Sequence, residues 1–206
     1  MLGIKRFKGQ SQIIGVVLLT LVMITMIGIT YMWGMPLIEK QKDVVRVSNV
    51  ERFMKELDNK IQNVAKNGGT QRIDNPNIPG ELKIIDYGTN DRIELIVQTT
   101  GTDMATEMDI YLKGDDNDEV SIGNEPSVLK VISNELGDNA YSVNMTLYYR
   151  NLTGSKNVYI IDLLSLGRDV ISGDGHRIVI SEGDHVPMMQ EGERAVYTTI
   201  INVRFE

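Results

Sequence analysis

The sequence predicts an α+β protein in which a long N-terminal hydrophobic and amphipathic helix is followed by an all-β, sandwich-like domain. Three observations support this class. Residues 13–34 contain no charged side chain, and residues 47–64 carry apolar side chains at helical spacing. From residue 81 onward, short apolar stretches alternate with turn residues. The predicted parts are a leader over 1–9, an apolar helix over 10–34, an amphipathic stalk helix over 35–69 and an extracellular β-rich domain over 70–206.

The apolar run has the length of a membrane span. Residues 13–34 are close to the roughly 20 residues that a helix needs to cross a bilayer, and only a helix satisfies its own backbone there. Lys5, Arg6 and Lys8 precede the run, so we expect the N-terminus on the cytoplasmic side and everything after Gly34 outside.

The residues before the apolar run contain a candidate cleavage site. The run is too long for a secretory signal, and no small-residue cleavage site follows it. A cut between Gly9 and Gln10, with Lys8 before it, would instead remove the basic leader and keep the helix. The leader resembles an archaeal class III, prepilin-type signal peptide. The stretch SQIIGVVLLTLVMITMIGI is similar to the N-terminal helix of archaeal type IV pilins and archaellin-like proteins.

This resemblance implies a maturation and assembly route. A prepilin peptidase would cleave after Gly9, and the freed helices would pack into a filament core. Ile14 stands at the fifth mature position, where many type IV pilins have Glu, so a contact that depends on that Glu is not carried over. The alternative is an uncleaved signal anchor. The residues expected in helix packing are Ile13, Ile14, Val17, Leu18, Leu21, Ile24 and Gly28.

The second half of the predicted helix is amphipathic. Pro36 either kinks the helix or restarts it. Beyond it, polar residues such as Asp58 are expected on the other faces, and Asn67-Gly68-Gly69 is a plausible stop. We expect the apolar seam to pack on the protein's own β-domain, and the helix before Pro36 to contact other subunits. The seam consists of Val47, Val50, Met54, Leu57, Ile61 and Val64, with Phe53 alongside.

The β-rich part begins after a predicted linker over 70–80. The last predicted strand alternates regularly, so we expect it deep in the sheet and against the stalk helix. The predicted strands are 81–87, 92–98, 107–112, 127–132, 141–150, 157–162, 176–181 and 194–205.

Charge and composition exclude several functions. After residue 34 the chain has 21 − 3 = 18 basic and 28 acidic residues, a charge of −10, which disfavours nucleic acid and anionic lipid. Without cysteine there is neither a disulfide nor a thiol metal site. His176 and His185 lack the spacing of a zinc pair, and no Gly-x-Ser-x-Gly motif is present. We therefore expect no enzyme activity, no cofactor and no dedicated metal site.

Two surface features remain as candidates. Asp115, Asp116 and Asp118 lie in an acidic run that we expect to be a solvated hairpin tip. The alternative is a Ca²⁺ site, although the run lacks the EF-hand layout. Asn144 and Asn151 begin glycosylation sequons; Asn151 is expected in a hairpin turn, and Asn144 in a strand, where it must face outward.

Two functions follow. In the first, the chain is a pilin: it polymerises into a homopolymeric surface filament through the pilus assembly machinery after a membrane-anchored stage, and its β-domain serves adhesion or motility. In the second, it is a single-span, membrane-anchored extracellular binding protein or a filament-accessory protein, such as a stator-like protein or minor pilin.

Overall fold

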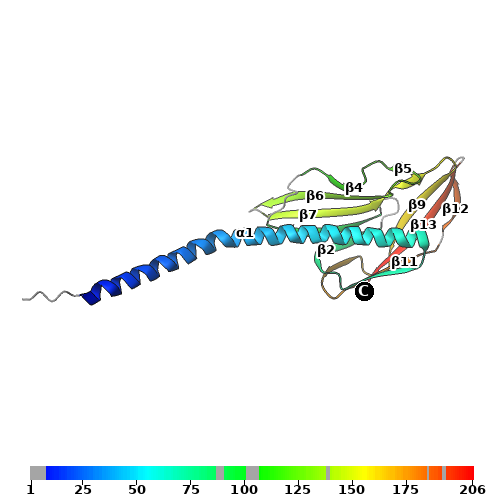
Figure 1. Ribbon diagram of the computed structural model, residues 1–206. Coiled ribbons are helices and arrows are strands. Elements are labelled where there is room, and N and C mark those ends of the chain that lie inside the picture. Colours follow the sequence, from blue (N-terminus) through cyan, green and yellow to red (C-terminus); the bar gives the residue numbers. More distant parts are fainter. Residues whose placement is uncertain (1–7, 87–90, 101–106, 138–139, 185, 192–193) are drawn as a thin grey trace, which may run out of the picture. The chain divides into compact units, whose positions relative to one another are not determined.

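The computed structural model describes the chain except residues 1–7, 87–90, 101–106, 138–139, 185 and 192–193. It contains one long helix followed by two β-sheets, which confirms the α+β class (Figure 1). The elements are α1 (Lys8–Asn67), β1 (Thr70–Asp74), β2 (Ile78–Ile85), β3 (Arg92–Thr99), β4 (Ile110–Lys113), β5 (Glu119–Ser121), β6 (Ser127–Gly137), β7 (Ala140–Tyr149), β8 (Asn151–Thr153), β9 (Asn157–Ser165), β10 (Val170–Gly173), β11 (Arg177–Glu182), β12 (Val186–Glu191) and β13 (Arg194–Phe205).

The chain divides into two compact units, Met1–Lys42 and Asp43–Glu206. In the first unit the described residues form only the N-terminal part of α1. That part continues through Pro36 without a break, so a new helix does not begin there. Within the described residues α1 is the one helix long and apolar enough to cross a membrane, and none of its most apolar window is buried.

The second unit is built around residues 43–67 of α1. Every residue of the predicted seam is buried, from Val47 at 5% exposure to Val64 at 0%, which confirms that the seam packs on the protein's own β-domain. The predicted stop is also confirmed: α1 ends at Asn67, and Gly68 has a φ of 71° that a side chain would disfavour. The Gly68 amide donates to the carbonyl of Val64 at 2.8 Å and closes the last turn.

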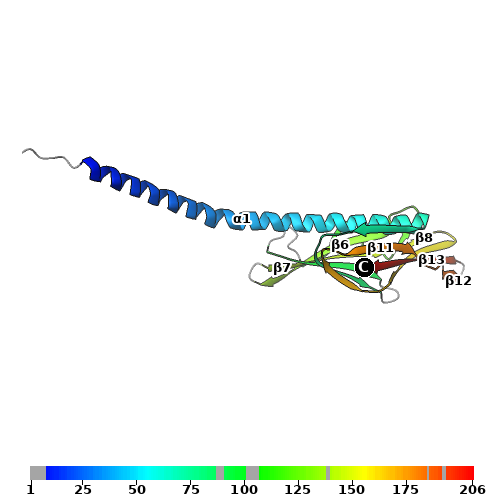
Figure 2. The same ribbon diagram turned by 90° about the horizontal axis from the view of Figure 1, so that it is seen from below.

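Two sheets complete the second unit (Figure 2). The seven-stranded sheet has the order β1-β11-β13-β9-β8-β5, with β12 paired to β13. The six-stranded sheet has the order β10-β2-β3-β7-β6-β4. β13 lies inside its sheet, and Ile201, Val203 and Phe205 join the same buried cluster as the seam, as predicted for the last strand. Apolar residues of both sheets and of the helix therefore share one core.

All eight predicted strands are confirmed, with shifted ends, but the predicted linker over 70–80 is wrong. Thr70–Asp74 forms β1, which pairs with β11, and β2 already begins at Ile78. Pro76 lies in the connection between β1 and β2, and Pro79 is the second residue of β2, where a missing amide is tolerated. The short strands β5, β8, β10 and β12 were not predicted either, because three to six residues carry too little periodicity to stand out from turns.

Candidate functional site

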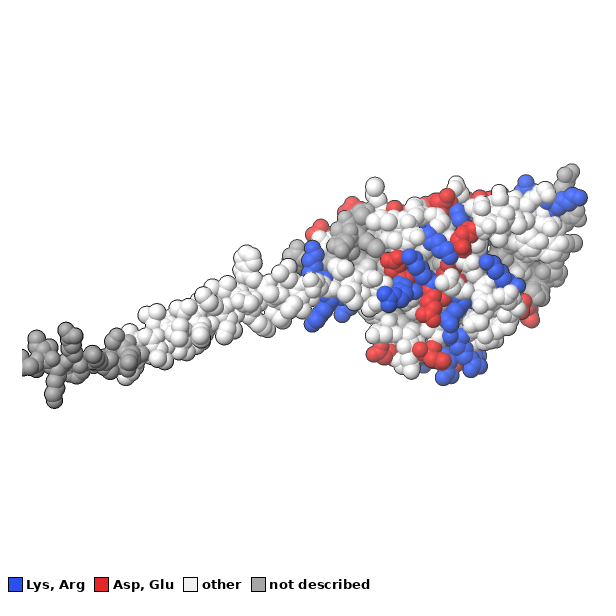
Figure 3. Space-filling model, in the orientation of Figure 1, with Lys and Arg blue, Asp and Glu red and all other residues white. Residues whose placement is uncertain are grey.

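The largest exposed apolar surface is the helix surface formed by residues 13–38. Its large side chains keep 37–78% of their area exposed, with Trp33 at the upper limit. In Figure 3 the visible face of this segment carries no charged atom, whereas acidic and basic side chains crowd the β-domain. A helix that is apolar on all sides must be covered by lipid or by other protein.

Three threonines in this surface form side-chain hydrogen bonds within the helix. The hydroxyls of Thr20, Thr25 and Thr30 each donate to the carbonyl four residues earlier, at 2.8 Å. A hydroxyl that is bonded in this way needs no partner outside the helix, so it can enter an apolar environment without an unsatisfied donor.

The predicted packing and processing residues all lie on α1. Ile13, Ile14, Val17, Leu18, Leu21 and Ile24 are exposed by 60–67%, and a Cβ on Gly28 would meet no atom within 4 Å. Lys8, Gly9 and Gln10 belong to the first turn of α1, whereas leader residues 1–7 lie outside the described residues. The predicted packing residues are therefore available for contacts outside the chain.

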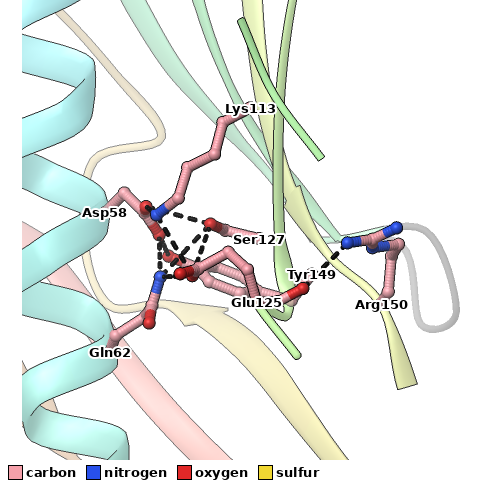
Figure 4. A network of polar contacts seen from close by, with 7 residues as sticks. All are labelled: Asp58, Gln62, Lys113, Glu125, Ser127, Tyr149 and Arg150. Atoms are coloured by element: carbon pink, nitrogen blue, oxygen red, sulfur yellow. Dashed lines mark hydrogen bonds and ion pairs between the residues drawn. The ribbon is translucent and has the colours of Figure 1, made fainter. Parts of the chain in front are cut away.

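A buried polar network attaches the helix to the β-domain (Figure 4). The Asp58 side chain is 1% exposed, so its predicted place on a polar face is wrong. Lys113 Nζ and Ser127 Oγ donate to one oxygen of Asp58, at 2.5 and 3.0 Å. Gln62 Nε2 and Tyr149 Oη donate to the other, each at 3.0 Å. Strands β4, β6 and β7 thus each place one donor on a single helix carboxylate.

Glu125 extends this network toward the surface. It accepts from Lys113 at 3.1 Å and from Ser127 at 3.1 Å, and it is in contact with Gln62. Burial alone would lower the pKa of the Lys113 ammonium group. The hydrogen bonds and negative charges of Asp58 and Glu125 outweigh this effect of burial, so the pKa of Lys113 is raised. Burial, together with the Asp58 charge, raises the pKa of Tyr149 well above its ordinary value. Lys113 and Asp58 therefore face each other as an ion pair at neutral pH.

A second helix carboxylate binds the end of β3. Asp43 Oδ2 accepts from the backbone amide of Thr100 at 2.8 Å and from its hydroxyl at 2.5 Å. Burial opposes the charge, but these hydrogen bonds prevail and lower the pKa of Asp43. Asp43 and Asp58 are 15 residues apart on α1, so the two contacts fix the helix to the six-stranded sheet at the start and near the middle of its packed segment.

The acidic tip makes contacts other than those of a calcium site. Asp115 pairs with the guanidinium of Arg150, and Asp116 accepts from the hydroxyls of Tyr111 and Tyr148. Asp115, Asp116 and Asp118 are exposed, as expected. The predicted hairpin is wrong, because β4 pairs with β6 in one sheet and β5 pairs with β8 in the other. Among the described residues, no group of three or more acidic, His or Cys side chains is arranged to hold a metal ion.

The two sequons differ in outcome: Asn144 lies in a strand, as predicted, and Asn151 does not lie in the predicted turn. Asn151 begins the short strand β8 instead of lying in a hairpin turn, and its side chain is half-buried. Asn144 lies in β7 between Ile96 and Ile132, with a buried Oδ1 that has no partner among the described residues. His176 contacts the carbonyl of Ser172 at 3.0 Å, and His185 lies outside the described residues.

A pair of carboxyl groups joins the two sheets at the start of β3. Asp91, next to β3, shares a hydrogen bond with Asp162 of β9. Partial burial, this hydrogen bond and the charges of Asp162 and Asp86 raise the pKa of Asp91 to about 7. The folded state therefore holds a proton that the unfolded chain, with its ordinary value of 3.8, releases at lower pH.

The Asp91→Asn variant should remove a pH dependence of stability. Because the folded-state pKa is raised, the wild type loses stability as pH rises from about 4 to 7, by about 1 kcal/mol after allowance for solvent screening. Asn keeps the neutral form, so the variant should be the more stable protein at pH 8 and equal to wild type at pH 4. Urea unfolding at both pH values measures this, with the exposed Asp174→Asn as control. Equal gains in the two variants would show that general charge repulsion is the cause.

Comparison with known proteins finds a match only for the N-terminal third of the chain. The pattern of a family of unknown function, DUF7289, matches residues 8–75, which comprise α1 and β1 and end before β2. No curated protein and no solved structure matches the chain. The matched stretch contains both the exposed apolar surface and the buried seam.

Proposed function

We propose that this chain is the structural subunit of an archaeal type IV pilus-like filament. The observation that carries the proposal is a helix that is apolar on all sides, exposed over residues 13–38 and joined to a β-rich domain. The motif Lys8-Gly9-Gln10 directly before this surface is the second support, because cleavage there leaves the apolar helix at the new N-terminus.

In this proposal the apolar surface has two environments in turn. The helix first crosses the membrane, with the basic leader inside and the β-domain outside. After the prepilin peptidase has removed the leader, the assembly machinery transfers the helix from lipid to the filament core. Lipid offers no hydrophobic gain over a protein core, so close packing has to drive the transfer. Small residues such as Gly15 and Gly28, where a Cβ would meet nothing, leave room for a neighbouring helix.

A membrane-anchored extracellular binding or filament-accessory protein is the second candidate. Ile14 favours it, since the fifth mature position lacks the Glu that many type IV pilins carry. In that case the helix stays in lipid, and the leader remains on the chain. The two candidates differ in the first residue of the mature chain and in the fraction where it is found.

The Gly9→Val variant should keep its leader. A branched side chain at the cut should exclude the peptidase, so intact mass and N-terminal peptide mapping should find Met1 in the variant and Gln10 in the wild type. The wild type should also be recovered in mechanically sheared material. Gly3→Val is the matched control, because it changes a leader glycine away from the cut. A wild-type chain that begins at Met1 and stays in the membrane would refute the filament proposal in favour of the second candidate.

A further inference from the structure

The inner face of the seven-stranded sheet continues beyond the end of the helix. Parallel pairing of β9 and β13 places residues opposite each other in successive rows. Leu163 and Ile201 form a row that is buried in the common core at 1% and 0% exposure. Four residues further along on the same face, Tyr159 and Tyr197 form a row that is 41% and 40% exposed. Since α1 ends at Asn67, this last row has no helix over it.

Tyr159, which lines a groove, is stacked against Tyr197. Their rings stack with centroids 5.2 Å apart and an interplanar angle of 16°. The groove has a volume of about 270 Å³ and lies between the last turns of α1 and β9. This is near the lower limit of about 300 Å³ for small-molecule sites. Its lining includes Ala65, Lys66, Pro126, Tyr159, Ile161 and Thr199.

The charge of the groove is opposite to that of the chain. The protein has a net charge of −7, yet the described groove lining contains Lys66 and Arg150 and no acidic side chain. Arg150 already pairs with Asp115 and donates to the Glu125 carbonyl at 2.8 Å. Lys66 is exposed and makes no ion pair with a described residue. A ligand in the groove would therefore meet the ammonium group of Lys66.

We propose that this groove, called here the tyrosine groove, binds an acidic saccharide. The apolar face of one sugar ring would lie on the face of Tyr159 that Tyr197 leaves free, and its carboxylate would face Lys66. Asn124 and Thr199 lie in the same lining and offer hydrogen bonds to hydroxyl groups. A charge-assisted bond to the carboxylate is stronger than a neutral one, which favours acidic over neutral sugars.

The topology disfavours a peptide in the same place. β9 is paired with β13 along its length and with β8 at Val158 and Tyr159, so an added strand finds no free backbone beside Tyr159. A docked helix needs an apolar groove several turns long, whereas this one accommodates about a single ring. The saccharide site is independent of polymerisation, because every contact comes from the β-domain and the helix segment packed on it.

Calorimetric titration of the full-length protein in detergent micelles tests the inference. The probes are trigalacturonate, its methyl ester and tetraglutamate. We expect trigalacturonate to bind, and the methyl ester, which keeps the rings but lacks the charge, to bind several-fold more weakly. Tyr159→Leu should weaken trigalacturonate at least tenfold, while Tyr159→Phe, which keeps the ring, should bind as wild type. Lys66→Gln should abolish the preference for the acid over the ester.

Matched controls separate the groove from the rest of the surface. Tyr111→Leu removes a tyrosine that contacts Asp116 outside the groove, and Lys55→Gln removes a lysine of the same helix that pairs with Glu51. Neither change should alter binding. The inference fails if trigalacturonate does not bind at millimolar concentration, if Tyr159→Leu leaves its affinity unchanged, or if tetraglutamate binds as tightly.

Discussion

The Asp58→Ala variant is expected to lose about 3 kcal/mol of unfolding free energy. The substitution leaves the Tyr149 hydroxyl without its acceptor, and it takes one of two carboxylates from Gln62, Ser127 and Lys113. Removing one partner of a buried ion pair costs roughly 3–5 kcal/mol. The lower end applies here, because Lys113 is 27% exposed and retains Glu125.

A double variant separates the charge from the packing. In Asp58→Leu/Lys113→Met both charges are gone, and the carboxylate that loses its partner, Glu125, is 42% exposed, so the loss should be smaller than in Asp58→Ala. Glu56→Ala is the matched control, since Glu56 is exposed on the same helix and its change should stay within about 0.5 kcal/mol. Denaturant unfolding followed by near-ultraviolet circular dichroism measures all three. If Glu56→Ala costs as much as Asp58→Ala, the buried network does not hold the helix.

Asp58 also shows where prediction from sequence ends. The apolar seam on α1 could be predicted because it repeats every three to four residues within one element, and all six of its members are buried. The environment of Asp58 is made by Lys113, Ser127 and Tyr149, which are 55, 69 and 91 residues away. Local periodicity carries no information about such distant partners. In the sequence, a buried aspartate therefore cannot be distinguished from an exposed one.

In the β-domain, too, local patterns could be predicted and contacts between distant residues could not. Long strands such as β3 and β7 have enough alternating residues to be predicted. β1 is a strand because it pairs with β11, which lies more than a hundred residues later in the sequence. The tyrosine groove depends on the parallel pairing of β9 with β13, which no local pattern reveals. The exposed apolar surface of α1, in contrast, could be predicted over residues 13–34, because an uninterrupted apolar composition excludes water as its permanent environment; Met35, Leu37 and Ile38 extend it further.

Val17→Asp is expected to abolish filament assembly while leaving the β-domain folded. Val17 is 60% exposed on the apolar helix surface, so its substitution disturbs no contact within the described chain. In a filament core, however, the same position would be enclosed by neighbouring helices, where an unpaired carboxylate is strongly unfavourable. Membrane insertion should suffer less, because residue 17 is near one end of the apolar run and a charge is most costly at the bilayer centre.

This difference between lipid and filament makes the variant selective. Val45→Asp is the matched control: Val45 is an equally exposed valine, at 58%, on the same helix but outside the apolar run, and its substitution should leave assembly intact. The measurements are the amount of chain in sheared and membrane fractions, and protease resistance of the β-domain in both variants. A Val17→Asp chain that enters sheared polymer at the wild-type level would show that residue 17 is not enclosed by other subunits. A membrane anchor with no polymer would instead leave both variants and the wild type together in the membrane fraction, so the same experiment distinguishes a subunit from an anchored protein.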